Sequence, residues 1–342
     1  MSSQTSVTPA QGFKIRTLTG VQVLSTGAFV PEQVVTNEEL REQVGCDPEW
    51  IVQRSGIHTR RVARPEQTTG FMALQAARQC LQRSQVDPQQ IDLLLLATFT
   101  ADKRLPATAC QLQHALGLNC PAFDLQAACA GFMYALVTAA QFIKSGTARH
   151  VLVAAGDCIT RFVDPRDPKT YPLFGDAAAA VLVGPGSGEQ GFLAYTLGSD
   201  GSGAELIDQP MGGSLCPPSA EAIAQGKHFM RMDGRAVFKW AVRLLNDSIL
   251  EVLQAAGVSK EEVDHLVLHQ ANARILDAAV EALGFDRRRL VLNLDRYGNT
   301  SAASIPLALD ELATGGRVQR GQKLLLSGFG AGLVWGTALF SW

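Results

Sequence analysis

The sequence predicts an α/β fold made of two similar halves, in which helices alternate with strands that are buried on both faces. Continuous apolar runs, such as residues 91–96 and 263–268, are typical of strands that helices cover on both sides. These two runs, with the helical segments before them, also resemble each other, which indicates an internal duplication. Similar helix–strand punctuation in unrelated α/β chains is the alternative explanation.

The predicted elements follow the same order in each half. Residues 1–16 are rich in Ser, Thr and Gln and predict a flexible tail. The N-terminal half is expected over residues 17–190 and the C-terminal half over residues 191–342. Each half reads as helix, apolar strand, loop, strand, small-residue turn, helix and final apolar strand, which is the order expected for two packed α/β layers.

Three polar residues lie at corresponding ends of these elements. A helix is expected to begin at Cys129, after a short apolar strand and a small-residue turn. His269 follows the strand at residues 263–268, and Asn299 lies in the turn before the next buried helix. Because α/β folds place their sites at such strand ends and turns, the two halves are expected to bring these residues to one central junction.

The bulk composition excludes several classes of function. With 342 residues, of which 46% are hydrophobic, the chain can bury a large core. Its net charge of −2 gives no long-range field for nucleic acid or an anionic membrane. The longest apolar run, residues 129–140, is too short to cross a bilayer. Seven cysteines without a Cys-x-x-Cys pair argue against a disulfide framework or structural zinc, so a cytoplasmic location without membrane or nucleic-acid partners is expected.

Cys129 is the candidate nucleophile. A thiol at a helix N-terminus faces unpaired backbone N–H groups and the positive end of the helix dipole, both of which favour the thiolate. The small residues around Cys129 leave room for a substrate carbonyl. This environment predicts an acyl-accepting cysteine, because a thiolate readily attacks a thioester. The alternative is an inert cysteine packed in the core.

His269 and Asn299 form a candidate pair of hydrogen-bond donors. A neutral histidine and an amide stabilise a developing enolate oxygen without being neutralised themselves. An asparagine in place of an aspartate also argues against a simple hydrolase, in which the histidine becomes a strong base. The glycine-rich turn at residues 327–332 could offer a backbone N–H to a tetrahedral oxyanion, beside that of Cys129.

Each of these residues also has a simpler interpretation. His269 could be a core histidine, and Asn299, after a glycine, could be a turn residue. The glycine-rich turn resembles a dinucleotide loop only superficially, since no amphipathic helix and acidic residue follow it. His265 and His269 share a strand face without further ligands, so no metal site is expected.

Several local motifs resemble the β-ketoacyl-acyl-carrier-protein synthase III family, in order from about Leu18 to the C-terminus. This resemblance implies a thiolase-like fold, with two pseudo-two-fold-related halves in a five-layer αβαβα arrangement, and a homodimer. The motifs lie at residues 50–57, 128–132, 174–179, 269–272, 297–304 and 332–336.

The resemblance also implies a role for individual residues. Cys129 would be the acylated nucleophile, His269 and Asn299 the decarboxylation pair, and the backbone amides of Cys129 and Ala331 the oxyanion hole. The remaining implied positions are Trp50, Arg54, Leu105, Asn272 and Phe329 for substrate or CoA, and Lys239 and Arg274 for docking of the acidic carrier protein.

The chain departs from the family pattern at four places, one of which is Leu105, where relatives often present an aromatic or small residue to the acyl tunnel of the partner subunit. Ala331 replaces a glycine, so this turn must accommodate a methyl group. Pro168 stands where an arginine usually covers the adenine, with Arg166 and Lys169 nearby. Glu281 replaces a basic residue that some relatives carry near the docking face. These departures leave the strength of CoA and carrier-protein binding open.

The resemblance implies a decarboxylative Claisen condensation of a short acyl-CoA primer with malonyl-acyl carrier protein, through an acyl-cysteine, that begins fatty-acid or polyketide synthesis. No metal or redox cofactor is expected, because the CoA thioester is a substrate. The alternative is an acyltransferase of specialised metabolism that passes the acyl group to another acceptor without decarboxylation. A third interpretation is a partner-binding subunit that retains the fold without turnover. The primer is left open.

Overall fold

Two five-stranded mixed sheets form the frame of the protein, whose computed structural model describes residues 12–342. The first sheet has the order β2 (Val21–Phe29), β8 (Ala177–Pro185), β7 (Val151–Asp157), β5 (Leu93–Ala97) and β6 (Ala122–Leu125). The second has the order β1 (Arg16–Thr19), β9 (Gly191–Ser199), β14 (Val334–Ser341), β13 (Lys323–Gly330) and β12 (His265–Leu268). Two small antiparallel sheets of two strands each pair β3 (Val34–Thr36) with β4 (Thr59–Arg61), and β10 (Ile207–Asp208) with β11 (Arg231–Met232).

The two large sheets repeat the same topology, which confirms the predicted duplication. In the first, β2 and β8 are antiparallel, β8 and β7 are antiparallel, and β7 and β5 are parallel. In the second, β9, β14, β13 and β12 follow with the same sequence of directions. The place of β6 is taken in the second sheet by a single parallel bridge between Leu266 and Leu290. The expected start of the second half, Gly191, is also the first residue of β9.

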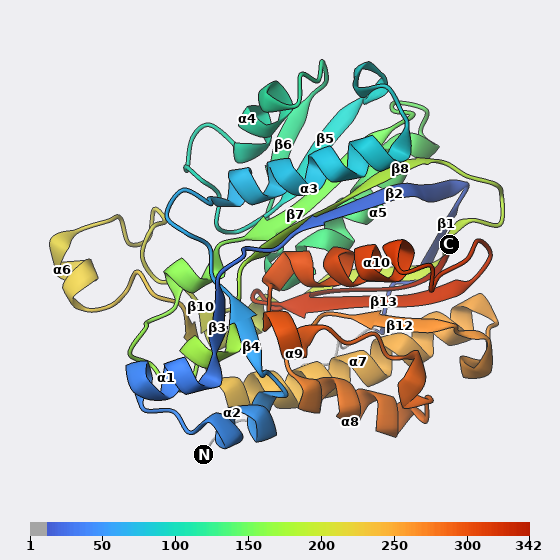
Figure 1. Ribbon diagram of the computed structural model, residues 1–342. Helices are drawn as coiled ribbons and strands as arrows, with labels where there is room; N and C mark the ends of the chain where they lie inside the picture. The colour runs from blue at the N-terminus through green and yellow to red at the C-terminus, as the bar shows by residue number, and fades with distance from the viewer. Residues whose placement is uncertain (1–11) are drawn as a thin grey trace.

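Helices cover both faces of each sheet and produce five layers (Figure 1). Between the sheets lie α5 (Gly131–Lys144) and α10 (Ser304–Thr314). The outer face of the first sheet carries α3 (Thr69–Ser84) and α4 (Thr108–Ala115), and that of the second carries α7 (Gly234–Ala256) and α8 (Ala273–Leu283). The αβαβα arrangement is therefore confirmed. The shorter helices are α1 (Asn37–Val44), α2 (Pro48–Ser55), α6 (Ala220–Ala224) and α9 (Leu294–Tyr297).

The sequences of the helices match their layers. Helix α5 lies between two sheets and buries Phe132, Leu136 and Ala139 on one side and Met133, Val137 and Ala140 on another. Its alanines allow the sheets to approach closely. Strand β5 is buried at every residue, because helices cover it on both faces. The turns that lead into the two central helices, α5 and α10, carry Cys129 and Asn299.

The N-terminal segment differs in part from the expected loose tail. Residues 1–11 lie outside the described residues. Phe13 and Ile15 pack against the core of the second half, and the Phe13 and Trp335 rings meet edge to face at 6.1 Å. Strand β1 then pairs with β9, so the first described strand belongs to the second sheet, and the next strand, β2, belongs to the first. Within residues 12–342, no helix is both long enough and apolar enough to span a membrane.

Candidate active site

A cavity of about 970 Å³ lies where the two halves meet, and its lining includes Cys129, His269 and Asn299. Cys129 comes from the first half, whereas His269 and Asn299 come from the second. The expected convergence of the three side chains on one junction is thus what the structure shows. The cavity is open enough, and apolar enough in its lining, to hold an extended ligand.

Cys129 lies in a short 3-10 turn, Ala128–Ala130, immediately before α5. Strand β13 ends against this turn at Gly330. A Cβ atom on Gly330 would lie 2.7 Å from the backbone nitrogen of Cys129, a distance at which the chains would have to move apart. The glycine therefore permits the second half to approach the backbone of the nucleophile.

The protonation state of Cys129 differs from the sequence-based expectation of a stabilised thiolate. Desolvation of the sulfur, and to a smaller extent the charge of Asp157, raises the pKa of the Cys129 thiol to about 12. The Ser301 hydroxyl, 3.4 Å from the sulfur, donates a hydrogen bond that lowers the pKa. Desolvation of a charge outweighs this hydrogen bond, so the resting group is a thiol.

Asp157 is a fully buried carboxylate near Cys129 that sequence reasoning missed. It accepts hydrogen bonds from the hydroxyls of Thr98 and Thr100, both at 2.9 Å, and from the backbone N–H of Phe99 at 3.0 Å. Burial raises the pKa of Asp157, and these hydrogen bonds lower it. The carboxylate also accepts from the backbone N–H of Ala302, at 3.4 Å, and so joins the two halves beside the nucleophile.

His269 follows β12 and is buried except toward the cavity. Its Nδ1 atom lies 2.7 Å from the Ser304 hydroxyl, and the Phe329 ring meets the imidazole edge to face at 5.1 Å. Burial lowers the pKa of His269 to about 3, because the imidazolium would lose its hydration. The ring is therefore neutral at pH 7, as the enolate-stabilising interpretation requires.

The side chain of Asn299 has a defined orientation. Its Oδ1 atom accepts a hydrogen bond from the backbone N–H of Ser301 at 2.9 Å. Its backbone N–H donates to the carbonyl of Leu173 at 2.8 Å, and its carbonyl accepts from Gly175 at 3.1 Å. Since Oδ1 is occupied, the amide presents its NH2 group to the cavity that Asn299 lines.

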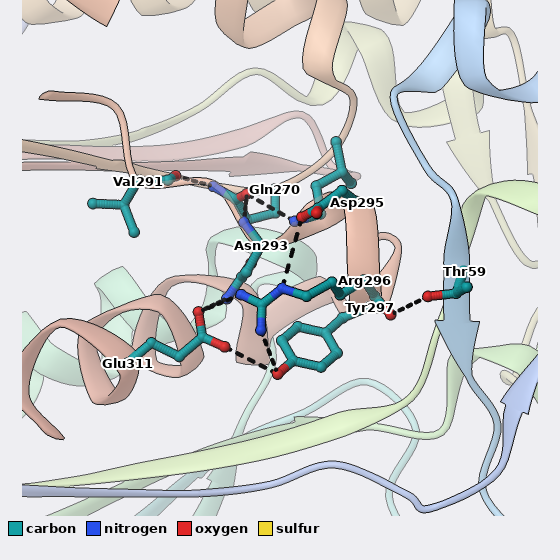
Figure 2. Close-up of polar contacts among 9 residues, drawn as sticks. Thr59, Gln270, Val291, Asn293, Asp295, Arg296, Tyr297 and Glu311 are labelled. Carbon is teal, nitrogen blue, oxygen red and sulfur yellow. Dashed lines mark hydrogen bonds and ion pairs between the residues drawn. The ribbon is translucent and has the colours of Figure 1, made fainter. Parts of the chain in front are cut away.

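Gln270 holds the strand end that carries His269 against the segment that leads to Asn299 (Figure 2). This fully buried amide accepts from the backbone N–H groups of Asn293 and Leu294, at 3.1 and 3.3 Å. It donates to the carbonyl of Val291 at 3.1 Å. Both ends of the amide therefore have hydrogen-bond partners. These bonds hold the segment that follows β12 against residues 291–294.

A second set of contacts fastens α9 to its neighbours (Figure 2). Glu311 on α10 accepts from the Arg296 guanidinium at 2.9 Å and from the Tyr297 hydroxyl at 3.0 Å. The carbonyl of Arg296 accepts from the Thr59 hydroxyl, on β4, at 2.9 Å. No local sequence pattern predicts these contacts, because the partners lie in separate elements of the chain.

The predicted oxyanion amides belong to two turns that line the same cavity. Cys129 is the middle residue of the first turn, Ala128–Ala130, and Ala331 lies in the second, between β13 and β14. The positive φ of this turn, 145°, falls at Gly332 and not at Ala331. The methyl group of Ala331 therefore fits ordinary backbone geometry, which explains how the chain accommodates this departure.

The expected CoA residues lie at the mouth of the cavity. Trp50 on α2 is 41% exposed, and the Arg54 guanidinium lies 5.9 Å from the centre of its ring. Asn272 caps α8 with its Oδ1 atom and donates from Nδ2 to the carbonyl of Arg54 at 3.0 Å. Lys169 also lines the cavity, whereas Arg166 is paired with Asp164 at 3.0 Å.

The remaining predicted positions lie on the surface. Leu105 is 86% exposed and is absent from the cavity lining. Lys239 and Arg274 are exposed on α7 and α8, as is Glu281, which adds a negative charge to α8. Sequence reasoning missed two further basic residues at the cavity, Lys103 and Arg104.

A cysteine, a neutral histidine and an amide between the halves of a duplicated five-layer fold define a thiolase-fold condensing enzyme, which transfers acyl groups. Sequence models of 3-oxoacyl-[acyl-carrier-protein] synthase III match residues 123–201, and models of its C-terminal part match residues 253–342. The β-ketoacyl-[acyl-carrier-protein] synthase III of Rhodopirellula baltica is 50% identical over 343 residues, which cover 95% of this chain and 99% of that relative. The chain belongs to the β-ketoacyl-acyl-carrier-protein synthase III family.

Solved structures agree with this assignment. The synthase III of Thermus thermophilus is 40% identical, with a TM-score of 0.88, and covers 94% of this chain and 98% of its own. The priming β-ketosynthase of the R1128 polyketide pathway is 35% identical, with a TM-score of 0.86, over 94% and 96% of the two chains. The predicted family, thiolase-like fold and acyltransferase class are confirmed.

Proposed function

We propose that this enzyme condenses a short acyl-CoA primer with malonyl-acyl carrier protein, using Cys129 as the acylated nucleophile and His269 and Asn299 as the decarboxylation pair. The observation that carries the proposal is the meeting of a thiol with two neutral donors in one cavity. The names of the relatives supply the carrier protein as partner. The reaction needs no metal or redox cofactor, since the CoA thioester is a substrate.

The first half-reaction transfers the acyl group to Cys129. The sulfur attacks the thioester carbonyl, and the backbone N–H groups of Cys129 and Ala331 hold the oxyanion that forms. The bond between carbonyl and CoA sulfur then breaks, and the proton lost by Cys129 ends on the CoA thiol. Because the pKa of Cys129 is about 12, this proton leaves during acylation and not before it.

The second half-reaction forms the carbon–carbon bond. Malonyl-carrier protein loses CO2, and its thioester oxygen becomes an enolate oxygen held by His269 and Asn299. The enolate carbon attacks the acyl-cysteine, the carbon–sulfur bond of Cys129 breaks, and the released thiolate takes a proton from solvent. A neutral His269 suits this step, because it can donate a hydrogen bond to the developing enolate oxygen without being neutralised itself.

The charges around the cavity support the choice of partners. Arg54, Lys103, Arg104 and Lys169 line it, and a phosphate-bearing CoA or pantetheine arm would meet this positive charge. The exposed Lys239 and Arg274 extend the positive charge outward, where they would attract an acidic carrier protein. Lys169, next to Pro168, would replace the arginine that usually covers the adenine, because Lys169 lines the cavity whereas Arg166 is paired with Asp164.

The deciding experiment incubates purified enzyme with acetyl-CoA and malonyl-carrier protein labelled in the free carboxyl group. We expect a mass increase of the acyl group at Cys129, followed by labelled CO2 and a β-ketoacyl-carrier protein. A panel of acyl-CoAs in the same mass measurement then identifies the primer. Acyl transfer to another acceptor without CO2 would contradict the proposal and support the non-decarboxylating acyltransferase instead.

We further propose a cytoplasmic homodimer. The seven unpaired cysteines support a reducing compartment. Strand β6 lies at the edge of the first sheet, and its residue Phe123 is 39% exposed, as an interface residue would be. Light scattering is expected to give twice the 36.6 kDa of the chain, and a monomer at micromolar concentration would contradict the dimer.

A further inference from the structure

Ser304 is a buried hydroxyl that the roles proposed above leave unused. It is the first residue of α10, and no part of its surface reaches solvent. Its Oγ atom lies 2.7 Å from Nδ1 of His269, a short and therefore strong contact. Within residues 12–342, the Ser304 hydroxyl has no other hydrogen-bond partner. The contact is thus between one buried serine and one buried imidazole.

The direction of this hydrogen bond follows from the cost of an unpaired donor. If Nδ1 carried the proton, the Ser304 oxygen would accept it, and the buried O–H of Ser304 would have no acceptor. An unmade hydrogen bond from a buried donor is expensive, whereas a spare lone pair on a hydroxyl that already donates costs less. Ser304 therefore donates to Nδ1, and the ring proton resides on Nε2.

The opposite ring nitrogen faces the substrate side. Nε2 of His269 has no partner within the described part of the chain, and His269 lines the cavity next to Asn299. With its proton on Nε2, the ring presents a donor to the cavity, as the NH2 group of Asn299 does. An imidazolium would also require Nδ1–H, and Ser304 would then lose its acceptor.

We infer that Ser304 is a positioning residue that fixes His269 as the Nε2–H tautomer and so supplies the second donor for the enolate. This inference rests on the proposed role of His269 in decarboxylation. It identifies Ser304 as the group that decides which nitrogen carries the proton. It predicts that Ser304 affects CO2 release from the malonyl group but not acylation of Cys129.

The tautomer can be measured directly on the wild-type enzyme. With 15N-histidine labelling, His269 is the signal that disappears in His269→Gln. At pH 7 we expect its Nδ1 to show the shift of an unprotonated nitrogen and its Nε2 that of a protonated one. A protonated Nδ1 would overturn the inference, whatever the variants of Ser304 do.

A substitution series provides the functional test. In Ser304→Ala we expect kcat for malonyl decarboxylation to fall about three- to tenfold, as for one lost hydrogen bond, with KM and the rate of Cys129 acylation unchanged. Ser304→Thr, which keeps a hydroxyl, should restore most of the rate. The matched control is Ser248→Ala, because Ser248 on α7 is equally buried and its hydroxyl lies 2.8 Å from that of Thr337 on β14.

The two levels of the argument fail in different ways. A wild-type enzyme that releases no CO2 would contradict the proposed function itself. A wild type that releases CO2, beside a Ser304→Ala enzyme of equal kcat and equal His269 15N shifts, would overturn only the role of Ser304.

Discussion

Cys129→Ala is expected to abolish acyl transfer from acyl-CoA completely, while the enzyme still decarboxylates malonyl-carrier protein slowly. The substitution removes the only group proposed to form a covalent bond with the primer. It leaves His269 and Asn299, the residues proposed to hold the enolate oxygen, in the cavity lining. Intact-protein mass spectrometry after exposure to acetyl-CoA, together with release of labelled CO2, measures both halves of this prediction.

The pH dependence of the same variant tests the protonation state of His269. Burial lowers the pKa of His269 to about 3, so the ring stays neutral as the pH falls to 5. Decarboxylation by Cys129→Ala should therefore be constant between pH 5 and 8, whereas a loss of rate centred near pH 6.5 would contradict a neutral donor. Cys120→Ala is the control, because Cys120 is also half-buried but does not line the cavity.

Asn299→Ala is expected to leave acylation of Cys129 nearly normal and to lower condensation by about 100- to 1000-fold, the usual effect of removing one donor to a developing oxyanion. The reason is that the NH2 group of Asn299 is proposed to contact substrate only in the second half-reaction. Acyl-enzyme should accumulate in the mass spectrum when acyl-CoA and malonyl-carrier protein are both present, and little β-ketoacyl product should form.

A second substitution separates chemistry from folding at this position. Asn299→Asp keeps the oxygen that accepts from the backbone N–H of Ser301, but it replaces the donor by a negative charge. It should therefore lose condensation at least as fully as the alanine variant. Asn246→Ala, on the outer helix α7, is the control. If Asn299→Ala blocked acylation alone, the assignment of Asn299 to the second half-reaction would be wrong.

Much of the site could be predicted because its residues lie where elements end. The small-residue turn before Cys129, the strand end before His269 and the turn around Asn299 are local features that a sequence displays. The supporting groups could not be found in this way. Asp157, Gln270 and Ser304 resemble ordinary core residues in sequence, and their roles arise from partners in other elements.

The clearest difference between expectation and structure concerns charge. From its place before a helix, Cys129 was expected as a thiolate, because the helix dipole is a property of the local chain. In the structure, Gly330 of the second half packs against the backbone of Cys129, and burial of the sulfur between the two halves raises the pKa of the thiol. This desolvation outweighs what the start of the helix contributes to the thiolate.

The sequence by itself determined the alternation of helices and strands, the duplication, and the three residues that meet in the cavity. Each of these depends on periodicity or on motifs a few residues long, which do not change when the chain is unfolded. Only the tertiary structure decided that β1 pairs in the second sheet, that the Cys129 thiol and the His269 ring are uncharged, and that Ser304 contacts Nδ1. Strand partners, solvent exclusion and hydrogen bonds between distant residues exist only after the two halves have packed together. Solvent exclusion and hydrogen bonds are also what shift the pKa of a buried group.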